Sequence, residues 1–68
     1  MIKVHYTTKT EIDSVATGRS LYEARQERGL TQEALADKLG YTKQYICKLE
    51  SGNAGFSDRL VRELERVL

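Results

Sequence analysis

The sequence has no proline, one cysteine and one histidine among its 68 residues. A single cysteine excludes a disulfide bond within the chain, and one histidine beside one cysteine excludes a zinc site formed by a single chain. No apolar run approaches the ~18 residues of a membrane-spanning helix, and no signal peptide is visible. We therefore expect a cytoplasmic protein that does not span a membrane and holds no metal or other cofactor.

Groups of residues that could catalyse a reaction are also missing. The sequence shows no serine–histidine–aspartate or cysteine–histidine arrangement with room for a cleft. It also lacks a glycine-rich loop of the kind that holds a phosphate. We therefore predict that the protein is not an enzyme.

The charges that are present nearly balance, with 11 Lys and Arg residues, 10 Asp and Glu residues and a net charge of +1. Taken alone, this balance gives little support to nucleic-acid binding, because many DNA-binding domains are markedly basic. Docking on phosphates depends more on how the charges are distributed. Basic residues lie between positions 19 and 48 and include Arg19, Arg25, Arg28, Lys43 and Lys48. Acidic residues gather nearer the C-terminus, at Asp58, Glu63 and Glu65.

A chain of 68 residues forms one domain, and a domain of this size buries only about 60% of the surface of its unfolded chain. An apolar fraction of 40% and the absence of proline suit a compact helical unit. Domains this small usually gain stability from disulfides, a metal or a second subunit. Since the first two are excluded, we expect a homo-oligomer.

Residues 31–52 have the pattern of two short helices joined by a tight turn. Thr31 and Thr42 each stand where an N-cap belongs, since a threonine hydroxyl can accept a free backbone N–H. Gly40 and Gly52 follow the two segments as the left-handed residues that end helices. Apolar residues recur three and four positions apart in each segment, at Leu35, Ala36 and Leu39 and then at Ile46 and Leu49. This arrangement matches the helix-turn-helix unit.

The same segment, T-Q-E-x-L-A-x-K-L-G-Y-T-x-x-Y-I-x-K-L-E-S-G, resembles the motif of the XRE family of prokaryotic regulators, which includes the Cro and repressor proteins of phages. The resemblance covers about residues 19–68. It departs from the family pattern after Gly52, where Asn53-Ala54-Gly55-Phe56 stands in place of the usual proline. The resemblance implies a mainly all-α fold, a four-helix helix-turn-helix bundle of the lambda-repressor-like type.

Two further helices are predicted, one on each side of this unit. The first runs from Leu21 to Arg28, with Ser20 and Glu23 as a capping box in which each residue satisfies a backbone donor of the other. The last begins after Ser57 and carries an apolar face formed by Leu60, Val61, Leu64, Val67 and Leu68. Residues 17–68 therefore form the predicted helix-turn-helix DNA-binding domain.

Residues 1–16 form a predicted N-terminal arm. From Ile2 to Thr8, apolar and polar residues alternate with the period of a half-buried strand, and residues 10–15 are a second, weaker β-prone stretch. Three interpretations remain open. The strand folds back as a hairpin against the helices, it pairs with a strand of another chain, or the arm is disordered.

The outward face of the helix 43–51 holds the predicted base-reading residues. By resemblance to the family, these positions are Thr42, Lys43, Gln44 and Lys48. Glutamine can make a bidentate contact with adenine, lysine can donate to guanine, and the methyl group of threonine can contact thymine. Cys47 projects beside them, either as a small neutral residue or as a redox-sensitive thiol.

Other positions are expected to hold the DNA backbone or the domain itself. The resemblance implies phosphate contacts from Gln32, Tyr45 and Asn53, and Gln32 starts a helix whose dipole favours an anion. Arg25 and Glu50 stand where the family pairs arginine with glutamate. We therefore predict a partly buried ion pair that fixes the angle between two helices.

The predicted function is that of a sequence-specific regulator that binds double-stranded DNA. We expect a dimeric repressor that reads a palindromic operator through the helix 43–51, with Phe56 and Leu60 at the dimer interface and the arm as reinforcement. The alternative is a protein-interaction module, of the antitoxin or anti-repressor type, in which residues 2–8 pair with a protein partner. Chromosomal, phage, antitoxin and controller proteins share this pattern, so all four contexts stay open.

Overall fold

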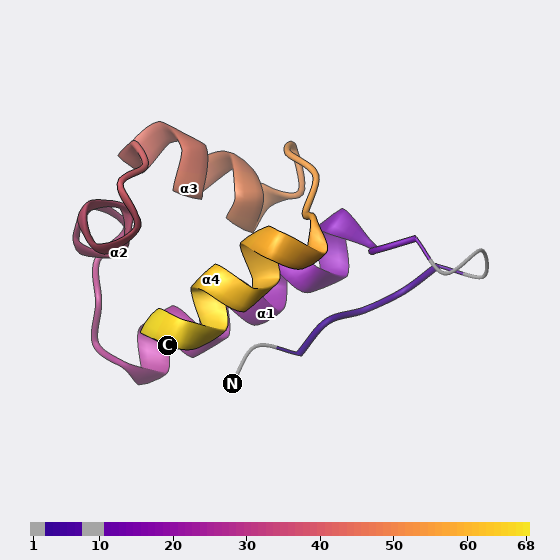
Figure 1. The fold of residues 1–68 in the computed structure, drawn as a ribbon, viewed down its shortest axis with the longest axis horizontal. Coiled ribbons are helices and arrows are strands. Elements are labelled where there is room, and N and C mark those ends of the chain that lie inside the picture. Colours follow the sequence, from indigo (N-terminus) through magenta and orange to yellow (C-terminus); the bar gives the residue numbers. More distant parts are fainter. Residues whose placement is uncertain (1–2, 8–10) are drawn as a thin grey trace.

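The computed structural model describes residues 3–7 and 11–68, and it contains four helices, as Figure 1 shows. They are α1 (Ser14–Glu27), α2 (Gln32–Leu39), α3 (Lys43–Ser51) and α4 (Asp58–Val67). Within the described residues there is no regular sheet, only an isolated antiparallel bridge between Tyr6 and Ile12. The prediction of a mainly all-α, four-helix helix-turn-helix bundle is confirmed.

The α2–turn–α3 unit has the boundaries that its capping signals predicted. The Thr31 hydroxyl accepts a hydrogen bond from the backbone N–H of Ala34 at 3.0 Å, and the Thr42 hydroxyl accepts one from Tyr45 at 3.1 Å. Gly40 and Gly52 end the two helices with φ angles of +77° and +82°. Because L-residues with a Cβ rarely adopt this left-handed region, glycine suits both positions.

Helix α1 begins well before the predicted start at Leu21, so this part of the prediction was wrong. Asp13 is its N-cap, and its carboxylate accepts hydrogen bonds from the backbone N–H groups of Val15 and Ala16. Ser20 does not form a capping box with Glu23, since it lies inside the helix and its hydroxyl donates to the Ala16 carbonyl at 3.3 Å. A serine hydroxyl can bond a nearby backbone group at a cap, or the carbonyl four residues earlier inside a helix, so spacing alone did not distinguish the two positions. α1 therefore crosses the boundary predicted between residues 16 and 17.

The described part of the N-terminal arm folds back on the helical bundle. The backbone N–H of Asp13 donates to the His5 carbonyl and that of Thr7 donates to the Glu11 carbonyl, each at 2.6 Å. The His5 N–H also donates to the Thr17 hydroxyl at 3.0 Å, which ties the arm to α1. For residues 3–7 and 11–13, these contacts agree with the interpretation in which the arm folds back as a hairpin against the helices. Ile2 and residues 8–10, which the predicted strands included, lie outside the described residues.

All four helices contribute to one hydrophobic core. Its members are at most 7% exposed and include Leu21, Ala24, Leu35, Ala36, Ile46, Leu49, Leu60, Leu64 and Leu68. Gly18 allows α1 to approach α3 closely, because a Cβ built there would overlap the carbonyl oxygen of Leu49. Gly18 was not among the predicted residues, although a glycine inside a helix is a signal that could have marked it.

Candidate nucleic-acid interface

The face of α3 that points away from the core carries the predicted base-reading residues. Ile46 and Leu49 are fully buried beneath α3, which fixes the helix in rotation. Thr42, Lys43, Gln44 and Lys48 are exposed on the other side, and so is Cys47. Among the described residues, the side chains of Lys43, Gln44 and Lys48 have no bonding partner. These polar groups are therefore available to a ligand that lies along α3.

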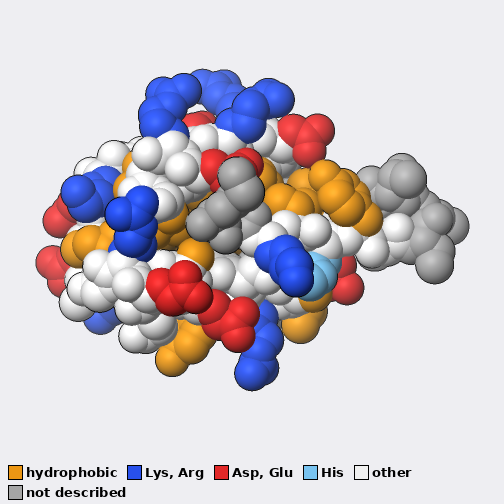
Figure 2. Space-filling model, turned by 90° about the horizontal axis from the view of Figure 1, so that it is seen from below, with side chains coloured by type: hydrophobic (Ala, Val, Ile, Leu, Met, Phe, Trp, Pro, Cys, Tyr) orange, Lys and Arg blue, Asp and Glu red, His pale blue; other side chains and the backbone are white. Residues whose placement is uncertain are grey.

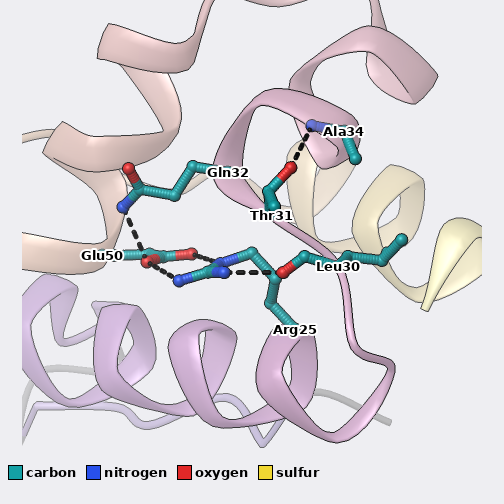
Figure 3. Close-up of polar contacts among 6 residues, drawn as sticks. All are labelled: Arg25, Leu30, Thr31, Gln32, Ala34 and Glu50. Atoms are coloured by element: carbon teal, nitrogen blue, oxygen red, sulfur yellow. Dashed lines mark hydrogen bonds and ion pairs between the residues drawn. The ribbon is translucent and has the colours of Figure 1, made fainter.

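Behind this face, Arg25 and Glu50 form the ion pair that the sequence predicted between α1 and α3 (Figure 3). Arg25 Nε lies 2.6 Å from Glu50 Oε2, and Nη2 lies 3.1 Å from Oε1. The two side chains are only 7% and 6% exposed. Such two-point contacts between a guanidinium and a carboxylate fix orientation as well as distance.

Two further groups complete this buried cluster. Arg25 Nη1 donates to the carbonyl oxygen of Leu30 at 2.7 Å, and Gln32 Nε2 donates to Glu50 Oε1 at 3.0 Å. The hydrogen bond from Arg25 to Glu50 raises the pKa of Arg25 above its ordinary value, although partial burial opposes the shift. The guanidinium also lies 5.3 Å from the centre of the Tyr22 ring. The cluster therefore joins α1, the α1–α2 turn, the start of α2 and the end of α3.

Gln32 was predicted as a phosphate contact, and its bond to Glu50 leaves room for that role. A side-chain amide nitrogen carries two N–H donors, and Glu50 engages Nε2 through a single hydrogen bond. Gln32 is also the first residue of α2, where free backbone N–H groups and the helix dipole favour an anion. The Gln32–Glu50 contact was not predicted, because nothing in the spacing of the two residues indicates it.

The other two residues predicted to contact phosphates differ in how exposed their side chains are. Tyr45 is half-buried, and its ring centre lies 5.0 Å from that of Tyr41 with the planes tilted by 59°. Asn53 is exposed, with its side-chain nitrogen 3.0 Å from the Ser51 hydroxyl and its backbone N–H on the Lys48 carbonyl. Tyr45 therefore combines a packing role with an accessible edge, whereas Asn53 lies open at the end of α3.

The two residues predicted at a dimer interface also differ in exposure. Leu60 is 4% exposed and belongs to the core of the single chain. Phe56 is half-buried and packs against the same core from the α3–α4 connection. Of the two, only Phe56 has appreciable side-chain surface left for a partner subunit.

Neither a metal site nor a membrane span accompanies this surface in the described part of the chain. Residues 3–7 and 11–68 contain no group of three His, Cys, Asp or Glu side chains that could hold a metal ion. No helix among them is both long enough and apolar enough to cross a membrane.

Comparison with known proteins places this geometry in a family. Residues 21–68 match the family model described as helix-turn-helix. An uncharacterised HTH-type transcriptional regulator of Methanothermobacter thermautotrophicus is 46% identical over 46 residues, which are 68% of this chain and 67% of that protein. Multiprotein-bridging factor 1 of Candida albicans is 39% identical over 54 residues, or 79% of this chain and 36% of that protein.

A human relative likewise matches most of this chain but only part of its own length. Endothelial differentiation-related factor 1 of Homo sapiens is 33% identical over 55 residues, which are 81% of this chain and 37% of that protein. The chain thus spans little more than a third of the length of these two longer relatives. The helix-turn-helix match over residues 21–68 and the two-thirds coverage of the M. thermautotrophicus protein show that the chain belongs to the XRE-type helix-turn-helix family of transcription regulators.

Proposed function

We propose that this chain binds double-stranded DNA in a sequence-specific manner as a homodimer and represses transcription by occupying promoter DNA. The observation that carries the proposal is the exposed face of α3. The side chains of Lys43, Gln44 and Lys48 on this face have no partner among the described residues. The opposite face is fixed by Ile46, Leu49 and the buried pair of Arg25 and Glu50. A rigid helix that presents free donors and acceptors suits the major groove.

Within this proposal, the residues that contact DNA divide into two kinds. Gln44 reads adenine, Lys43 and Lys48 donate to guanine, and the methyl group of Thr42 contacts thymine. Gln32, Tyr45 and Asn53 hold phosphates and so position α3 without reading sequence. The division predicts that substitutions of the first kind change specificity, and that those of the second kind change affinity for all sequences alike.

The small size of the surface that would read bases favours a dimer. The nine residues of α3 can contact only a few base pairs, which is too little information among the ~10⁶ or more competing sites of a genome. Two-fold pairing through Phe56 would double the site and place two copies of α3 about 34–36 Å apart on one face of the duplex. A second subunit would also add apolar burial to a small core.

Selection from a random duplex library tests the proposal directly. Immobilised protein should enrich a palindromic sequence, and Gln44→Ala protein should enrich one in which a single position of each half-site is relaxed. Gly55→Ala is a suitable control variant, since a Cβ there meets nothing within 4 Å. A library that stays random after repeated rounds with folded protein would contradict the proposal.

A second candidate function is supported by the name of one longer relative, multiprotein-bridging factor 1 of Candida albicans. In this function the chain binds another protein, and residues 2–8 add a strand to it. Of the described arm residues, His5 and Thr7 already use backbone groups in hydrogen bonds to Asp13 and Glu11. The backbone groups of Val4 and Tyr6 would therefore form the edge that pairs with a strand of the partner. Deletion of residues 1–9 separates the two functions, because it should abolish strand pairing with a partner protein. The same deletion should only weaken DNA binding by α3, through reduced dimerisation.

A further inference from the structure

A row of arginines follows the exposed side of α4, on a different face from the DNA-reading side of α3. Arg59, Arg62 and Arg66 are spaced at three and four residues, so they lie above one another on the helix. All three are exposed, and together with Glu63 they line a shallow depression of about 380 Å³. Figure 2 shows basic side chains gathered along one edge of the molecule, on the side where α4 stands in the foreground of Figure 1.

The acid within this row is already engaged by its own chain. Glu63 Oε1 lies 3.5 Å from Arg59 Nε, and its other oxygen accepts a hydrogen bond of 3.3 Å from the Tyr41 hydroxyl. Partial burial and the nearby carboxylate raise the pKa of Tyr41, so the phenol stays protonated and donates. Arg62 and Arg66 have no partner among the described residues. These two guanidinium groups are therefore free to pair with carboxylates of another molecule.

A second, smaller depression adjoins the first and brings apolar surface to it. It has a volume of about 150 Å³ and is lined by Lys38, Leu39, Glu63, Arg66 and Val67. Glu63 and Arg66 line both depressions, so the two are neighbours on the surface. Leu39 and Val67 are half-buried. The combined α2–α4 surface thus has an apolar floor, four surrounding cations and one carboxylate that is already paired.

We propose that this α2–α4 surface is a docking site for an acidic, amphipathic helical segment of another protein. Bidentate guanidinium–carboxylate pairs suit Arg62 and Arg66, and aliphatic side chains of the partner would cover Leu39 and Val67. Phosphates of DNA need no such apolar floor. The surface also lies at the C-terminal end of α2, opposite to Gln32 at its N-terminus. The inference does not depend on DNA binding by α3.

A designed peptide provides the probe for this site. It spans about five helical turns, roughly 18 residues at ~3.6 residues per turn, with glutamates on one face and leucines beside them. Titration into ¹⁵N-labelled protein at ~0.15 M salt should shift the amide signals of Lys38, Leu39, Arg62, Arg66 and Val67 in a saturable manner. A peptide with glutamine in place of every glutamate should bind at least tenfold more weakly, and so should one with serine in place of every leucine.

Matched charge reversals show whether the proposed surface carries the binding. Arg66→Glu should lower the affinity for the glutamate peptide about tenfold or more. Arg19→Glu reverses another exposed arginine, on α1, and should leave the affinity for this peptide unchanged. Thermal unfolding of both variants establishes that each is folded. Equal effects of the two reversals, or no saturable binding of the glutamate peptide, would overturn the proposal. If a DNA duplex instead shifted the α4 signals and the peptide did not, the arginine row would be a phosphate-binding surface.

Discussion

Gln32 and Glu50 are joined by a hydrogen bond of 3.0 Å, so the first residue of α2 contacts the same carboxylate that holds Arg25. Gln32 is the residue that the family resemblance assigns to a phosphate, and Glu50 lies near the end of α3, the proposed recognition helix. A phosphate held by Gln32 would therefore be linked to the position of α3 through one buried carboxylate. The stability of the domain and the placement of its reading helix should depend on the same cluster.

The first prediction concerns the stability supplied by this pair. Arg25→Met and Glu50→Gln should each lower the free energy of unfolding by about 3–5 kcal/mol, because each leaves a partner charge that is buried and unpaired. That loss is comparable to the whole stability of a domain of this size. Chemical denaturation measures it. Arg59→Met is the matched control, since Arg59 pairs with Glu63 while 88% exposed, and it should cost less than ~1 kcal/mol.

The second prediction concerns the close approach of α1 and α3 at Gly18. Gly18→Ala should lower the free energy of unfolding by about 1–3 kcal/mol, because the new Cβ would overlap a backbone carbonyl that cannot move away freely. Alanine favours a helix over glycine by up to ~1 kcal/mol, so packing and propensity act in opposite directions. Gly55→Ala, where a Cβ meets nothing within 4 Å, should be nearly neutral. A stabilised Gly18→Ala protein would show that the two helices are further apart than described.

Local signals predicted a large part of this fold and tertiary contacts account for most of the rest. The caps at Thr31 and Thr42 and the left-handed glycines at positions 40 and 52 are set by neighbouring backbone groups, so a short window of sequence suffices to find them. The start of α1 was missed because Ser20 had the spacing of a cap. Its true environment is a half-buried contact with His5, fifteen residues away in sequence.

The candidate site shows the same division between local and distant information. Exposure of Thr42, Lys43, Gln44 and Lys48 follows from the apolar period of α3, so the sequence could predict which side chains point outward. The bond from Gln32 to Glu50 and the hydrogen bond from Arg25 to the Leu30 carbonyl depend on how α1, α2 and α3 pack. The grouping of Lys38 with Arg66 of α4 is of the same kind. No periodicity within one element contains that information.

The third prediction separates base reading from phosphate binding. Gln44→Ala should lose about 1–3 kcal/mol of affinity for the selected duplex while its affinity for random DNA stays nearly unchanged. Gln32→Ala should weaken binding to both kinds of DNA by a similar factor. Fluorescence anisotropy titrations give both affinities. Since Gln32→Ala also removes a bond to Glu50, its unfolding curve must be compared with that of the native chain. Equal losses from Gln44→Ala on both duplexes would contradict the assignment of α3.

The fourth prediction concerns the dimer. Phe56→Asp should give a folded monomer with weak operator binding, because a charge would replace the half-buried aromatic surface proposed as the principal contact. Deletion of residues 1–9 should reduce dimerisation and leave the helices folded, since the described part of the arm contacts α1 through polar groups of His5. Sedimentation velocity, with and without operator DNA, measures both effects. A Phe56→Asp protein that still sediments as a dimer would remove this interface.

The ratio of affinities for two duplexes tests the central claim most directly. Anisotropy titrations at ~0.15 M salt would compare the selected palindrome with a scrambled duplex of the same length and composition. If α3 reads bases from the major groove of two half-sites, the palindrome should bind at least about 10³-fold more tightly, with two chains per duplex. Equal affinity of folded native protein for the two duplexes would contradict sequence-specific DNA binding by this chain.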